Sequence, residues 1–416
     1  MARYSTFAMT QAFTRRDAMR IGAGGLVAGV LANDQSAVAQ QETADSPAER
    51  PFLTPAKDFR DVSRGTPLPH TLKGDALVNA RLTPETWRLE IVAEEQVALA
   101  SPKRLDDNTA IDFAALLDVG KAHGVRFLKA MQCNNIPLPL GQGLWEGVPL
   151  RDLLALCGPI DNARRLFYWG FHNNDPKQLF RSSLAINQVF DTPPGELPPF
   201  VAYRLNGEPI PLVRGGPVRM VVPWAHGFKS IKWLQKIVLT NDYQANDTYA
   251  EKNNDPESNL KTAAYFEDLE PEKFADGQPI TVRGTAMVGW PGIERVEYWL
   301  RPDGGTGGKL ADSDAAWGTA IWKPGTIDPP PQNWRGALPD GLLPKDIWGF
   351  TTEGQPKEWP LRYSIAHWTL SLNNVPAGKY ELRVRTIDKN GFGQPLPRSG
   401  QKSGRNLIQC KLIAVG

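Results

Sequence analysis

The chain has 416 residues, of which 41% are hydrophobic and 22% are charged, and its 47 basic and 45 acidic residues almost cancel. This length favours two domains, each with its own core. The balanced charge argues against a nucleic-acid-binding surface and against a polybasic membrane anchor. Its 38 glycines, 36 prolines and 13 tryptophans indicate a fold rich in strands and loops, with few helices.

The N-terminus is expected to be an export signal. Residues 14–20 read TRRDAMR, which resembles the twin-arginine motif, and residues 37–39 offer small side chains to a signal peptidase. The apolar stretch between them, 21–32, is too short for a membrane span, which takes roughly 20 residues. We therefore expect a signal peptide over 1–39, a linker over 40–60, a periplasmic location and no membrane span in the mature chain.

The first folded domain is predicted over 61–260 as a mixture of strands and helices. Apolar residues at helical spacing after Asp112 predict a helix over 112–123, and residues 148–158 predict a short helix that ends at Gly158. Alternating apolar residues predict the strands of this domain over 87–92, 125–132, 164–171, 200–210, 217–224 and 232–240.

The second domain, 261–416, is predicted to be all β. Its alternating segments are separated by Gly, Pro and Asn turns, which is typical of a β-sandwich. The predicted strands are 280–288, 293–301, 367–375 and 380–391. Residues 302–362 are rich in Pro, Gly and Trp, and we expect an ordered excursion over the sandwich or over the neighbouring domain.

Cys133 stands at the end of a predicted strand, in the sequence QCNNIP, and LWEGVPLRDLL follows at 144–154. This arrangement resembles the oxidoreductase molybdopterin-binding domain of the sulfite oxidase family. The resemblance implies that Cys133 is the thiolate ligand of molybdenum in a pyranopterin cofactor. A soft thiolate suits such a metal. A lone cysteine without this pattern would more often be a buried structural residue.

A second stretch resembles the segment of this family that cradles the pterin. It comprises NGEPIP at 206–211, RGGPVRMVVPW at 214–224 and GFKSIKWL at 227–234. The resemblance implies that Arg219, Ser230, Ile231 and Lys232 hold the pterin and its phosphate. A guanidinium, an ammonium and loop amides are suited to a buried phosphate. Arg214 stands where relatives place a residue that contacts the pterin.

Other positions match the family more loosely. Residues 63–69, SRGTPLP, resemble the Arg-Asn-His-x-Pro-Val-Pro segment of the family, which implies that Arg64 faces the metal and that Thr66 contacts the pterin. His172 lies in a loop that borders the cofactor in relatives, although a structural role is equally compatible with the sequence. Tyr249 occupies the place of a tyrosine that can donate a hydrogen bond to a substrate oxygen.

The substrate is left open by the sequence. Sulfite-oxidising relatives carry two arginines shortly after the ligand cysteine, where this chain has Pro137 and Leu138. A dianionic oxyanion needs such fixed positive charge. We expect oxygen-atom transfer on a small, sulfur-containing substrate. A reductase of S- or N-oxides and a non-catalytic subunit with the same fold are the alternatives.

The electron carrier is expected on another chain. The three cysteines, Cys133, Cys157 and Cys410, form no haem-attachment motif and no iron–sulfur pattern. A c-type cytochrome is the expected partner, and no haem is expected here. Residues 284–286, 294–297, 303–305 and 385–395 resemble the immunoglobulin-like dimerisation domain of the family, which implies a homodimer. The fold class expected is α+β, with a sulfite oxidase-like domain followed by an immunoglobulin-like sandwich.

Overall fold

The computed structural model describes residues 52–133, 136, 138–245, 248, 259–303, 309–331, 334, 337–396 and 407–416. The expected signal peptide over 1–39, most of the linker and Tyr249 therefore lie outside the described residues. Within the described part, strands dominate and the helices are few and short, as the composition predicts. No described helix is long and apolar enough to cross a bilayer.

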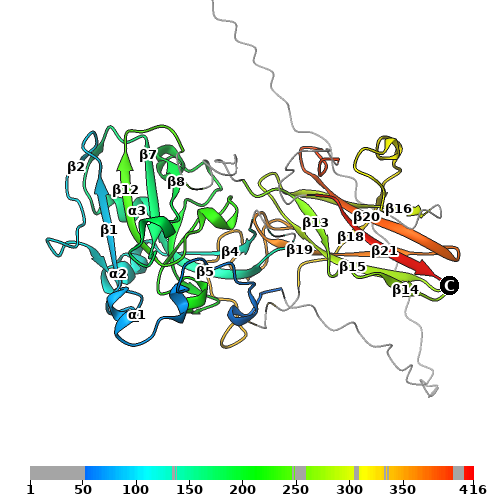
Figure 1. Ribbon diagram of the computed structural model, residues 1–416, viewed down its shortest axis with the longest axis horizontal. Coiled ribbons are helices and arrows are strands. Elements are labelled where there is room, and N and C mark those ends of the chain that lie inside the picture. The colour runs from blue at the N-terminus through cyan, green and yellow to red at the C-terminus, as the bar shows by residue number, and fades with distance from the viewer. Residues whose placement is uncertain are drawn as a thin grey trace, which may run out of the picture. The chain divides into compact units, whose positions relative to one another are not determined.

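Two five-stranded sheets build the first half of the chain (Figure 1). One has the order β3 (Ile111–Asp112), β1 (Arg88–Ala93), β12 (Leu234–Thr240), β7 (Arg165–Gly170) and β8 (Ser182–Ala185). The other has the order β10 (Glu208–Pro209), β9 (Phe200–Leu205), β5 (Gly141–Pro149) and β4 (Val125–Met131), with β11 (Arg219–Val221) paired to β9. A two-stranded ribbon joins β2 (Ala98–Leu99) to β6 (Ile160–Asp161).

Four short α-helices accompany these sheets: α1 (Asp75–Asn79), α2 (Phe113–His123), α3 (Leu150–Ala155) and α4 (Ile186–Phe190). The prediction of a helix after Asp112 is confirmed, because the carboxylate of Asp112 caps α2 by accepting a hydrogen bond from the backbone N–H of Ala115 at 2.8 Å. The second predicted helix begins later than expected, at Leu150. Val148 and Pro149 instead end strand β5.

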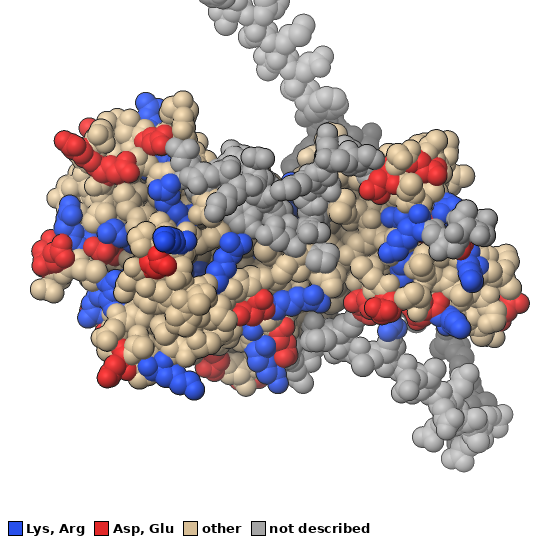
Figure 2. Space-filling view, in the orientation of Figure 1, with Lys and Arg blue, Asp and Glu red and all other residues tan. Residues whose placement is uncertain are grey.

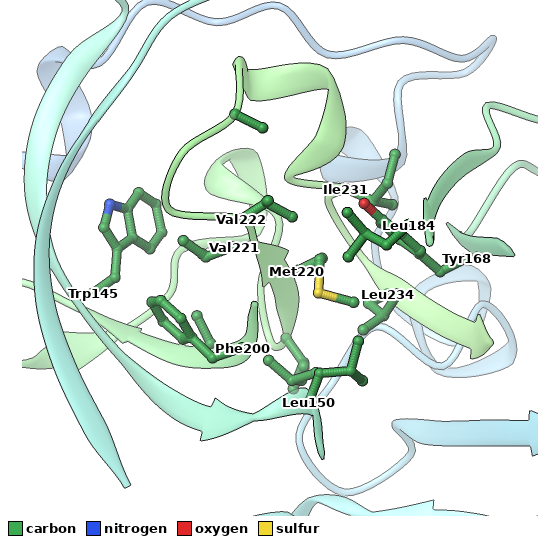
Figure 3. Packing of buried hydrophobic residues seen from close by; sticks show 14 of the residues in the cluster. Trp145, Leu150, Tyr168, Leu184, Phe200, Met220, Val221, Val222, Ile231 and Leu234 are labelled. Atoms are coloured by element: carbon green, nitrogen blue, oxygen red, sulfur yellow. The ribbon is translucent and has the colours of Figure 1, made fainter. Parts of the chain in front are cut away.

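One large hydrophobic core lies between the sheets of the first half. Figure 3 shows Met220 with Trp145 and Phe200 on one side and Tyr168 and Leu184 on the other. Trp145, Phe200, Met220 and Tyr168 have no exposed surface. Each fully buried side chain of this kind contributes about 1.5–3 kcal/mol relative to exposure. The strands that lead into the site are thus fixed by packing.

The second half contains two more sheets. One has the order β13 (Ala263–Phe266), β15 (Ile280–Met287), β19 (Ile365–Leu372) and β18 (Thr326–Ile327). The other has the order β14 (Glu272–Phe274), β21 (Gln409–Val415), β20 (Gly378–Asp388), β16 (Ile293–Pro302) and β17 (Lys323–Pro324). Side chains from both sheets share one buried cluster that includes Trp368, Phe266 and Leu382. The four strands predicted here are confirmed.

The excursion predicted over 302–362 packs onto the first half of the chain. Ile347, Phe350 and Leu361 form a cluster with Leu128 of β4 and Leu144 of β5. The backbone carbonyl of Arg126 accepts a hydrogen bond from the N–H of Trp348 at 2.8 Å. The back of the strand that leads to Cys133 is therefore supported by this excursion. Lys, Arg, Asp and Glu are interspersed over the face seen in Figure 2, in keeping with the near-zero net charge.

Candidate molybdenum-cofactor site

A cavity in the first half of the chain collects most of the residues that the sequence singled out. Its walls come from residues 59–65, which we call the entry segment, and from the chain around Cys133, the loop after β7 and residues 214–233. Of the predicted site residues, eight line it: Arg64, Cys133, His172, Arg214, Arg219, Ser230, Ile231 and Lys232. Four stretches far apart in the sequence thus line the same cavity.

Cys133 follows strand β4 and is half-buried, with a free thiol. Two hydrogen bonds hold the backbone just before Cys133. The carbonyl oxygen of Gln132 accepts a hydrogen bond from the N–H of Gly227 at 2.7 Å, and that of Met131 accepts one from Leu140 at 2.7 Å. The other two cysteines are buried, and burial raises the thiol pKa of Cys157 to about 11 and that of Cys410 to about 12. Cys133 is the cysteine placed to bind a metal.

Arg219 is a buried residue of the cavity lining, and its guanidinium is suited to binding an anion. Its guanidinium donates hydrogen bonds to the carbonyl oxygens of Arg214 (2.7 Å) and Ser230 (2.6 Å) and lies 5.0 Å from the ring centroid of Trp145. Its Nε atom is buried without a hydrogen-bond partner. Burial, followed by the charge of Arg214, lowers the pKa of Arg219 to about 9, so the group stays charged at neutral pH.

Lys232 provides a second, half-buried cation in the lining that contains Arg219. Its ammonium donates to Oδ1 of Asp61 (2.9 Å), Oγ of Ser63 (2.7 Å) and the carbonyl oxygen of Val213 (2.7 Å). Burial and the charge of Arg219 lower the pKa of Lys232 to about 8, although Asp61 acts in the opposite direction. Burial of Asp61 raises its pKa, but the hydrogen bonds from Ser63 and Lys232 outweigh this and lower it to about 2.

The local backbone requires glycine where these cations meet. Gly215 has φ of +100°, and a Cβ atom there would lie 2.7 Å from Cγ and 2.9 Å from Cα of Lys232. Burial also lowers the pKa of the neighbouring Arg214, whose Nε donates to the carbonyl oxygen of Ala56 at 2.8 Å. Three cations thus share one wall, and the orphaned Nε of Arg219 calls for an acceptor. These residues fit the phosphate of a pyranopterin.

The remaining predicted residues are less closely tied to the cavity. The Nδ1 atom of His172 lies 3.2 Å from the carbonyl oxygen of Gly170, so Nδ1 carries the proton because a carbonyl can only accept. Thr66 is exposed and is not among the lining residues; its backbone N–H donates to Oε1 of Gln178 at 2.8 Å. Its contact with the pterin stays a prediction. Arg64 lies with its Cζ atom 4.9 Å from the ring centroid of Phe180.

Sequence reasoning missed several residues in and around the cavity. Asp61, which binds Lys232, lies in a loop without a recognisable pattern, and the contact of Ser63 with Lys232 was not predicted either, because only the fold brings these residues near residue 232. Five Phe and Trp side chains of the described residues also line the cavity: Phe59, Phe171, Phe180, Phe228 and Trp233. Among the described residues, no group of three or more His, Cys, Asp or Glu side chains could hold a metal ion.

Comparisons with known proteins concern the part of the chain that forms this cavity. The oxidoreductase molybdopterin-binding domain matches residues 76–248. The NADPH nitrate reductase of Fusarium oxysporum is 37% identical over 106 residues, which are 26% of this chain and 11% of that protein. The mitochondrial sulfite oxidase of Macaca fascicularis is 25% identical over 198 residues, 46% of this chain and 36% of that protein. The chain thus spans well under half the length of these curated relatives.

A solved structure shares the fold over most of the chain. The sulfane dehydrogenase SoxCD from Paracoccus pantotrophus superposes with a TM-score of 0.54, at 18% sequence identity, over 84% of this chain and 86% of that one. The matched domain covers the strands that carry Cys133 and the cationic wall. Residues 76–248 thus match the oxidoreductase molybdopterin-binding domain, and the chain is similar to nitrate reductases and to sulfite oxidase.

Proposed function

We propose that the protein is a periplasmic molybdenum-cofactor enzyme that transfers an oxygen atom to or from a small, sulfur-containing substrate and passes electrons to a separate carrier such as a c-type cytochrome. One observation carries the proposal. The accessible thiol of Cys133 shares a cavity with buried cations whose charge is only partly offset by Asp61. This combination suits a metal tethered by one thiolate and an anionic pterin.

The residues divide the work within this cavity. When bound, the molybdenum pyranopterin supplies two-electron redox chemistry and a site for oxygen transfer. Cys133 would ligate the metal, while Arg219, Arg214 and Lys232 would hold the phosphate end. Because Nδ1 of His172 donates to the carbonyl oxygen of Gly170, Nε2 is the ring nitrogen left to contact a ligand. Arg64 would face the metal, and Tyr249 would donate a hydrogen bond to a substrate oxygen.

Metal analysis and two activity assays test this function. We expect the purified protein to contain molybdenum and pterin and to reduce ferricytochrome c with a sulfur compound such as sulfite or thiosulfate. The same preparation is then assayed with reduced viologen and S- or N-oxides. Turnover in the second assay alone would show a reductase. If the protein is expressed in a host that synthesises the cofactor and still contains neither metal nor pterin, the result would support the non-catalytic alternative.

We also propose that residues 1–39 direct export through the twin-arginine route and that 261–416 form an immunoglobulin-like domain that joins two copies. The twin-arginine motif supports the first part, and the shared cluster of the two sheets supports the second. Changing Arg15→Lys and Arg16→Lys together should retain the protein in the cytoplasm. Light scattering of the mature protein should give the mass of a dimer, and a monomer at micromolar concentration would contradict it.

A further inference from the structure

The surroundings of Cys133 are apolar, in contrast with the cationic wall of the same cavity. Met131, Leu140 and Phe228 all line it. Met131 and Leu140 are joined by the backbone hydrogen bond that pins the cysteine loop, and Phe228 follows Gly227, which bonds to Gln132. Cys133 itself packs against the hydrophobic core cluster that includes Met131 and Leu140.

The loop after Cys133 adds no charge to this end of the cavity. Ile136 and Leu138 are half-buried and pack against the main hydrophobic core. A polar substrate bound next to the cysteine would therefore find apolar side chains where arginines would otherwise neutralise it. A substrate with two negative charges would lose hydration there without full compensation.

Arg64 provides an exposed positive charge in the cavity lining. Its guanidinium lies over the ring of Phe180, with 4.9 Å between Cζ and the ring centroid, and both residues line the cavity. The aromatic face restricts the guanidinium without using its N–H groups. Among the ion pairs of the described residues, none involves Arg64. Arg60 of the entry segment also lines the cavity and is exposed to solvent.

Apolar walls and a positioned guanidinium fit a substrate with one negative charge and an apolar body. An organosulfinate, R–SO2−, meets this description, because it is sulfite with one oxygen replaced by a carbon group. It keeps the sulfur lone pair that accepts an oxygen atom.

We propose that the substrate class is the organosulfinates, an inference that rests on the proposed oxygen-transfer function. The reaction is R–SO2− + H2O → R–SO3− + 2 H+ + 2 e−. A new S–O bond forms at the sulfur lone pair, the oxygen comes from water, and two O–H bonds of that water break. Sulfur is oxidised by two electrons, which reduce two equivalents of a one-electron acceptor such as a c-type cytochrome or ferricyanide, and the protons leave to solvent. Arg64 binds the sulfonyl oxygens, and Phe180, Phe228 and Leu140 contact R.

Steady-state kinetics of the molybdenum-loaded enzyme with ferricyanide test this inference. The probes are methanesulfinate, benzenesulfinate and sulfite at mildly alkaline pH, where sulfite is mainly a dianion. We expect kcat/KM to be higher for both sulfinates than for sulfite. The sulfonate product should carry one heavy oxygen when the reaction is run in 18O-water. Sulfite turnover that exceeds that of both sulfinates overturns the inference and leaves the proposed function standing.

Variants identify the contacts. Arg64→Gln should raise KM for sulfinates by roughly ten- to a hundredfold, as expected for a lost charge-assisted hydrogen bond, with kcat and molybdenum content retained. Arg64→Lys should restore part of the loss. Lys73→Gln, an exposed cation outside the cavity lining, is the matched control. An unchanged KM in Arg64→Gln overturns the assigned contact.

The apolar part of the proposal has its own variant. Phe180→Leu keeps an apolar side chain but removes the aromatic face, so it should lower kcat/KM for benzenesulfinate more than for methanesulfinate. Equal losses for both compounds contradict a contact with R. If a molybdenum-loaded enzyme oxidises none of the three compounds but reduces S-oxides with viologen, both the oxidative direction and this inference fail.

Discussion

The ammonium of Lys232 lies 2.9 Å from the carboxylate of Asp61, so the entry segment already holds the cation that faces the cavity. Because Lys232 has a pKa lowered to about 8, it loses its proton as the pH rises through that value, well below its ordinary value of 10.5. The positive charge of Lys232 is therefore present at neutral pH and is lost in mild alkali.

This titration predicts pH-dependent anion binding by the cofactor-free protein. Sulfate is a suitable probe because its charge is constant over this range. Calorimetry should show sulfate affinity falling as pH rises above about 8, with proton uptake on binding. Lys232→Gln should bind more weakly and lose this pH dependence, whereas Lys73→Gln should behave as the wild type. An equal pH dependence in Lys232→Gln would refute the assignment to this residue.

Cys133→Ser should abolish turnover while the fold is retained. The thiol is half-buried and packs at the edge of the core, so we expect the free energy of unfolding to change by less than about 1 kcal/mol. Molybdenum content and denaturant unfolding measure the two effects separately. Cys157→Ser is the control, since it removes a buried thiol outside the cavity and should keep the metal. A fully active Cys133→Ser enzyme would rule out ligation.

Arg219→Lys should weaken retention of the pterin even though the charge is kept. Lysine cannot donate to the carbonyl oxygens of Arg214 and Ser230 in the planar geometry of the guanidinium, nor present an Nε donor between them. We expect at least a tenfold loss of pterin affinity, or about 1.4 kcal/mol, measured by pterin fluorescence after denaturation of matched preparations. Arg295→Lys, a surface arginine, should retain the wild-type content.

Gly170→Ala should disturb the cationic wall through the backbone. A Cβ atom at this position would overlap the carbonyl oxygen of Lys232 and lie 2.7 Å from that of Trp233. We expect a loss of about 2–4 kcal/mol of stability, together with weaker sulfate binding. Gly318→Ala is the matched control, because a Cβ atom there meets nothing within 4 Å. Denaturant unfolding and calorimetry of both variants check this expectation.

Local patterns explain why most strands and the capped helix α2 could be predicted. Strand β5 was missed, because Gly141 and Gly143 give it the appearance of a loop. The fold explains these glycines: a Cβ atom at Gly141 would lie 2.7 Å from the ring of Phe59. The strand predicted over 217–224 is also shorter than expected, since only Arg219–Val221 pairs with β9.

The cationic site was accessible to sequence reasoning because its residues lie close together in one motif. Arg214, Arg219 and Lys232 all fall in the stretch that resembles the family. Asp61, in contrast, is far from Lys232 in the sequence, and a single carboxylate in a loop predicts no partner. Contacts between distant segments depend on tertiary packing, which periodicity and spacing do not encode.

The walls of the cavity come from segments far apart in the sequence, and this affects the stability of the protein with its cofactor bound. A bound cofactor would cross-link the entry segment, the cysteine loop and residues 214–233, and so favour the folded chain by mass action. Occupancy would then be read out as resistance to heat and to proteases. Arg60 and Arg64, both exposed in the entry segment, are the natural places for trypsin to report an empty molecule. Resistance to trypsin would thus distinguish protein with bound cofactor from empty protein before the proposed export.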